Sequence, residues 1–168
     1  KMSTFSQRML GAAKLEASIY KEVRADTQAT GQALGVVVLA SIAQGIAAFA
    51  QGGLRGFALG TGTALGVWFV WALVVYLVGT KILPEPLTRS DLGEVLRTTG
   101  FAASPGLLRV LGLVPGLGFL SVVAVSAWMF LAMILAVRQA LDYESLERTV
   151  GVCLIGWFLH IVVGVMLR

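Results

Sequence analysis

Long runs of apolar residues, separated by short polar segments, set the pattern of this chain. The first uncharged run covers residues 31–51, and similar runs cover 61–83, 118–137 and 149–167. Between the first two runs we predict a loop at about residues 52–60. A helix needs roughly 20 residues to cross a hydrocarbon core of about 30 Å, and each run is close to that length. Because only helices and closed barrels pair every backbone group inside a bilayer, the pattern predicts an all-α, polytopic transmembrane helical bundle.

A shorter and less regular run at residues 98–114 decides between four spans and five. It contains Pro105, which removes a backbone donor, and neighbouring glycines that loosen a helix. The acidic segment 90–94 before it is typical of a helix start. We predict five spans with a kinked or broken third helix, and a re-entrant segment at 98–114 is the alternative.

A polar, mixed-charge segment, residues 1–29, precedes the predicted transmembrane domain at 30–168. Its apolar residues have the spacing of one helix face, which predicts an interfacial amphipathic helix on the membrane surface. A solvated helix with internal ion pairs is the alternative. We expect no cleavable signal peptide, because no continuous apolar run comes earlier. The residues of this face are Phe5, Met9, Leu10 and Ala13.

The number and distribution of charged residues indicate a membrane protein and predict its orientation. Only 13% of residues are charged, against about 25% in soluble domains. Five spans leave no room for a separate catalytic or nucleic-acid-binding domain. With a cytoplasmic N-terminus, nearly all cations and all nine acidic residues fall on the inner side, which predicts a multi-pass protein of the inner (plasma) membrane. The only outward cations are then Arg55 and Arg168, with Arg109 inside the membrane.

Two ionisable residues inside the apolar runs are candidates for special chemistry. Arg109 is either an anchor that reaches the outer interface or a site for an anion, a lipid head group or an ion pair. His160 shares a helix face with Gly156 and Gly164, so it either hydrogen-bonds a neighbouring helix or serves as an axial ligand to haem or chlorophyll. Paired carboxylates, phosphate loops and activated nucleophiles are not found, so we predict no enzyme and no metal site.

Small residues at four-residue intervals predict close helix packing or partner contact. The pairs are Gly31 with Gly35 and Gly62 with Gly66. Gln44 is a polar residue within the first run, able to bond another helix or to line a solute path. On the cytoplasmic side, we expect Tyr20, Glu22 and Asp26 to contribute to protein contact.

Four segments in order carry a family resemblance: YKEVRADTQATGQA at 20–33, LRTTGFAASPGLL at 96–108, the turn at 115–118, and AVRQALDY at 136–143. Together they resemble bacterial members of the Ypt-interacting-protein (Yip) family of membrane proteins. The resemblance implies five transmembrane helices and a cytoplasmic N-terminus. Eukaryotic members bind small prenylated GTPases. The long N-terminal extension and the acidic motif of those members are missing here, so that activity is not transferred.

Two functions remain open from the sequence. The first is a non-enzymatic scaffold or accessory subunit that joins other integral membrane proteins in a hetero-oligomer, for example in a respiratory or photosynthetic complex. It needs no cofactor of its own, and its partners are the lipid bilayer and membrane proteins rather than nucleic acid. The second is a channel or transporter for a small solute, which requires polar residues that converge on a midplane cavity.

Overall fold

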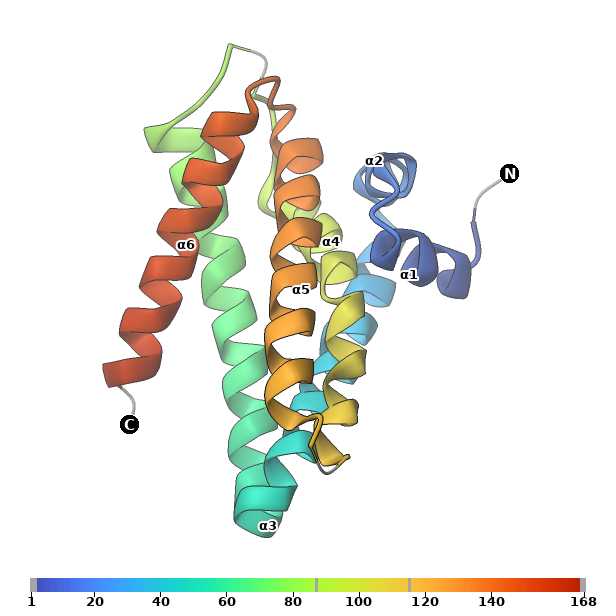
Figure 1. The fold of residues 1–168 in the computed structure, drawn as a ribbon. Coiled ribbons are helices and arrows are strands. Elements are labelled where there is room, and N and C mark those ends of the chain that lie inside the picture. The colour runs from blue at the N-terminus through green and yellow to red at the C-terminus, as the bar shows by residue number, and fades with distance from the viewer. Residues whose placement is uncertain (1–2, 87, 115, 167–168) are drawn as a thin grey trace.

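The computed structural model describes residues 3–86, 88–114 and 116–166, except for the side chains of 159–161 and 163–166. The described chain is helical and contains no strand (Figure 1). This confirms the predicted all-α class. The elements are α1 (Phe5–Ala13), α2 (Ala17–Ala25), α3 (Ala29–Leu77), the π-helix η1 (Val78–Ile82), α4 (Leu92–Ala102), the 3₁₀ helix η2 (Ser104–Leu113), α5 (Gly118–Leu141) and α6 (Leu146–Met166).

Helix α3 is folded back on itself at Gly53, which makes two antiparallel legs. Gly53 has φ 56° and ψ −144°, a conformation that glycine adopts without a side-chain clash. A Cβ on Gly60 would lie 3.0 Å from the Cβ of Ala48, whereas twelve residues of straight helix span about 18 Å. The legs therefore pack against each other near the turn.

This hairpin corrects the predicted loop at residues 52–60. Apart from Gly53, the segment is helical throughout. A single residue with a positive φ reverses the chain, so the apolar residues on either side continue their helices. We call this end of the bundle, which contains Gly53 and the start of α5, the hairpin end.

The region from Leu92 to Leu113 begins as an α-helix and continues as a 3₁₀ helix. Asp91 caps α4, because its carboxylate accepts a hydrogen bond from the Glu94 backbone N–H at 2.7 Å. This confirms the helix start predicted at 90–94. The helix type changes at Ser104, immediately before Pro105. Gly100 packs closely on α3, since a Cβ there would lie 2.8 Å from the Cβ of Ala33.

The N-terminal segment forms two short helices instead of one amphipathic helix. Leu15 has a φ of 64°, and the backbone N–H groups of Leu15 and Glu16 bond back to Ala12 and Gly11. This is a Schellman motif, which ends α1 and turns the chain into α2. Glycine usually occupies the left-handed position of this motif. Because Leu15 occupies it here, the sequence does not indicate that α1 ends at this point.

Helices α1 and α2 lie against the flank of the bundle, beside α4 and α5 (Figure 1). Phe5 and Met9 pack on the core, while Leu10 is 58% exposed. The indole N–H of Trp128, on α5, donates to the Ala13 carbonyl at 2.7 Å. The predicted apolar face of residues 1–29 thus mainly covers the protein itself.

Two helical stretches, Ala29–Ile82 and Gly118–Leu141, are long and apolar enough to cross a membrane. The core between the helices is built mainly from alanine, valine and a few larger side chains. Many large apolar side chains outside the core are exposed, including Phe119 at 84% and Phe158 at 67%. Cys153 is buried, as a packing residue would be.

Candidate functional site

The charged residues gather at the end of the bundle opposite Gly53, which we call the charged end. Arg24, near the end of α2, joins four parts of the chain there. Its Nε donates to Glu94 at 3.0 Å, one Nη donates to the Gln139 carbonyl at 2.9 Å and to Asp142, and the other Nη donates to the Arg89 carbonyl at 3.1 Å. The hydrogen bond to Asp142, with Glu94, raises the pKa of the Arg24 guanidinium. Arg24 thereby ties α2 to α4, α5 and the segment before α4.

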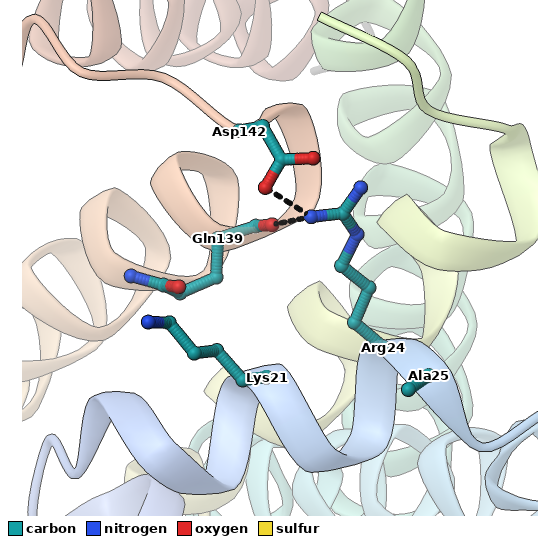
Figure 2. A pocket seen from close by; sticks show the side chains of 5 residues that line it. All are labelled: Lys21, Arg24, Ala25, Gln139 and Asp142. Atoms are coloured by element: carbon teal, nitrogen blue, oxygen red, sulfur yellow. Dashed lines mark hydrogen bonds and ion pairs between the residues drawn. The ribbon is translucent and has the colours of Figure 1, made fainter. Parts of the chain in front are cut away.

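A shallow pocket of 230 Å³ opens beside this arginine, between α2 and α5. Lys21 and Arg24 enter it from α2, and Gln139 and Asp142 enter it from the end of α5 (Figure 2). The Lys21 ammonium extends toward the Gln139 side chain, whereas the Arg24 guanidinium turns toward Asp142. The side chains present hydrogen-bonding and ionic groups of both signs, which suit polar contact at a surface.

A second arginine, Arg8, is buried where α1, α2 and α3 meet. Its side chain is 2% exposed. It donates to Glu22 at 2.9 Å, to Asp26 at 2.8 Å and to Gln32 at 3.1 Å. Burial would raise the pKa of Glu22, but hydrogen bonds from Ser3 and Arg8 hold it below its ordinary value. The hydrogen bond from Arg8 likewise lowers the pKa of Asp26.

A third set of contacts joins η1 and the segment before α4 to the segment between α5 and α6. The Tyr143 hydroxyl bonds to the Gly79 carbonyl at 2.9 Å and the Leu83 carbonyl at 2.6 Å. The Glu85 carboxylate accepts from the backbone N–H groups of Glu144 at 2.8 Å and Ser145 at 3.3 Å, next to the start of α6. Burial, together with Glu85, raises the pKa of Tyr143. The hydroxyl therefore stays protonated and available as a donor.

The residues predicted for cytoplasmic protein contact instead make contacts with other residues of this chain. Tyr20 is fully buried, and its hydroxyl donates to the Ala12 carbonyl at 2.9 Å. Glu22 and Asp26 pair with Arg8. The structure therefore brings these three residues together as internal support for α1 and α2.

The predicted glycine pairs lie on surfaces that the described part of the chain leaves uncovered. A Cβ on Gly31, Gly35, Gly62 or Gly66 would meet nothing within 4 Å. Gly156 differs, because a Cβ there would lie 2.6 Å from the indole nitrogen of Trp71. The surroundings of Gly164 and the side chain of His160 lie outside the described residues.

The intramembrane polar candidates stand apart from the charged end. Arg109 lies in η2 and Gln44 in the first leg of α3. Both are partly buried. Within the described part of the chain, the side chain of neither has a hydrogen bond or ion pair to another residue. No group of three histidine, cysteine or acidic side chains that could hold a metal occurs in that part either.

Several residues that organise the structure give little signal in the sequence. Arg97 donates to the Val23 and Arg24 carbonyls and so caps the end of α2. Gly45 packs against the second leg of α3, where a Cβ would lie 2.8 Å from the Phe57 carbonyl oxygen. The signal that could have found Arg97 is its place one turn after Glu94 on α4, facing the same neighbour.

Comparison with known proteins gives no matching family model, curated protein or solved structure.

Proposed function

We propose that this chain is a non-enzymatic integral membrane protein that binds other membrane proteins, as a scaffold or accessory subunit. In this proposal its five spans are the two legs of α3, the α4–η2 segment, α5 and α6. The N-terminus and the charged end face the cytoplasm, and the hairpin end faces outward. The proposal includes the relationship to the Yip family that the sequence segments suggest.

The distribution of exposed side chains supports membrane insertion. Large apolar residues are exposed along α3, α5 and α6, for example Leu59 at 58%, Leu120 at 63% and Leu154 at 51%. A soluble monomer rarely exposes so many apolar side chains on adjoining helices. Every acidic residue lies in the N-terminal segment, or in or next to the segments that connect helices at the charged end. Bilayer contact explains both features.

Support for partner binding comes from the uncovered glycines. Gly62 and Gly66 lie four residues apart on an exposed stripe of α3, and nothing in the described chain approaches them within 4 Å. Glycines at inner positions, such as Gly45 and Gly100, are in close contact with neighbouring helices. Since lipid tails provide no hydrophobic driving force for helix association, close backbone approach at such stripes favours a partner helix.

The experiment is co-purification from native membranes with Gly66→Leu and a matched control. The control is Ala124→Leu, which places the same side chain at an exposed small residue of α5. We expect Gly66→Leu to lower partner yield by about tenfold, because side-chain bulk prevents close helix approach. The helix itself should persist, since leucine favours helices more than glycine does.

The control should keep its partners. Unchanged partner yield in Leu variants at all four uncovered glycines would contradict the proposal. If solute flux in proteoliposomes were then abolished by changes at Arg109 or Gln44, the transporter interpretation would replace it.

A further inference from the structure

Arg109 lies on the inner face of η2, near the hairpin end. In a 3₁₀ helix, residues three apart lie above one another, so Arg109 shares its face with Gly106 and Gly112. A Cβ on Gly106 would lie 3.2 Å from the Cβ of Ala40 on α3, and one on Gly112 would lie 3.4 Å from the Ser121 hydroxyl on α5. The face that carries Arg109 is therefore turned toward α3 and α5.

The sequence supplies no acidic partner for this arginine. No aspartate or glutamate occurs between Asp26 and Glu85 or between Glu94 and Asp142. These two intervals contain all of α3, η2 and α5. The buried arginines of the charged end, by contrast, are paired with carboxylates or helix carbonyls. A cation held without a counter-charge in apolar surroundings is unfavourable, so an anion from outside the chain would stabilise Arg109.

The position of Arg109 selects a phosphate at the membrane surface as that anion. Arg109 is four residues before Leu113, which corresponds to about 8 Å along a 3₁₀ helix. In the proposed topology, an extended arginine side chain covers most of this distance toward the outer interface. The start of α5 lies at the same end, and its first turn contains no acidic residue. The positive end of that helix adds to the attraction.

We propose that Arg109 binds the phosphate of an anionic phospholipid of the outer leaflet, at the junction of η2, α3 and α5. The guanidinium offers two parallel N–H donors, which match two oxygens of a phosphate. This inference rests on the proposed membrane topology, but not on the binding of a protein partner.

The test compares lipid binding by the wild-type chain and three arginine variants. The purified protein in detergent is titrated with phosphatidylglycerol, phosphatidylcholine or inorganic phosphate, and bound molecules are counted by native mass spectrometry. The variant is Arg109→Gln. The control is Arg55→Gln, since Arg55 lies at the same end on the exposed hairpin turn. Arg109→Lys keeps the charge and shows whether the charge alone is enough.

We expect one phosphatidylglycerol to remain bound to the wild-type protein and to Arg55→Gln. Arg109→Gln should weaken that binding by about tenfold, the size expected for the loss of charge-assisted hydrogen bonds. Equal lipid binding by Arg109→Gln and wild type would overturn the proposal. Displacement of the lipid by millimolar inorganic phosphate would also overturn it, by showing a site for a free anion. Partner yield in Gly66→Leu is a separate measurement, so the two proposals can fail independently.

Discussion

Arg8 is the residue on which the position of α1 depends most. Its buried guanidinium neutralises Glu22 and Asp26, and Arg8→Ala would leave both carboxylates without their cation. We expect a loss of about 2 kcal/mol in the free energy of unfolding. This is less than the 3–5 kcal/mol typical of a fully buried pair, because Glu22 remains 25% exposed. Denaturant unfolding measures it, with Lys14→Ala, at an exposed position, as a nearly silent control. Equal stability of the two variants would contradict the account.

The same cluster predicts a pH dependence. The pKa values of Glu22 and Asp26 are lower in the folded protein than their ordinary values, which are about 4. The unfolded chain therefore binds protons more readily than the folded chain at mildly acidic pH. Stability should be complete above about pH 5 and should fall as the pH drops through the folded pKa values. Unfolding measured between pH 3 and 7 tests this, and Arg8→Ala should flatten the dependence.

Single residues show where sequence reasoning stops. The helical spacing of Phe5 and Met9 correctly indicated an apolar face, but it could not say whether that face meets lipid or protein. The charge distribution predicts that Tyr20 and Glu22 belong to a cytoplasmic face suited to protein contact. Their actual neighbours, Ala12 and Arg8, come from α1, and the turn at Leu15 that brings the two helices together has no glycine to mark it.

At the scale of elements, the two legs of α3 depend on glycine at their contact. A Cβ on Gly45 would lie 2.8 Å from the Phe57 carbonyl oxygen and would also collide with Thr61. Gly45→Leu should therefore separate the legs and lower the free energy of unfolding by about 2 kcal/mol, within the range for overpacked cores. Gly62→Leu is the matched control, since no described atom of a neighbouring segment lies within 4 Å of a Cβ at that position. Similar destabilisation by both substitutions would show that the contact is not specific.

A second element, the π-helix η1, is stabilised by Tyr143. Tyr143→Phe removes the hydroxyl that bonds to the carbonyls of Gly79 and Leu83. Leaving buried acceptors unpaired should cost about 1–2 kcal/mol. Faster amide hydrogen exchange from 78 to 86 would report the local loss. An equal acceleration in all helices, with no excess at 78–86, would assign the effect to global stability instead.

The apolar runs predicted the long helices well, because their length and composition leave few alternatives. The predicted loop at 52–60 was wrong for a physical reason: one glycine in a left-handed conformation can reverse a helix without extended residues. The 3₁₀ character of η2 was not predictable from Pro105 alone, since proline is also found within the first turn of ordinary helices.

For the whole molecule, the sequence indicated the uneven distribution of charge, and the structure shows how the charges are used. Ion pairs and hydrogen bonds to backbone carbonyls join several charged residues of this end, while others, such as Lys81 and Glu147, remain exposed. Pairings such as Arg24 with Glu94 and Asp142 join residues far apart in the chain. No local pattern encodes such contacts, because they depend on how the helices are arranged.

The most direct test of the central claim, a membrane-spanning bundle with a cytoplasmic charged end, is two-sided cysteine labelling in intact cells. The native Cys153 is buried, so background labelling should be low. Single cysteines replace Arg55 at the hairpin end and Glu147 at the charged end. A membrane-impermeant maleimide should label Arg55→Cys in intact cells and Glu147→Cys only after permeabilisation. Labelling of both positions from the same side would contradict the account.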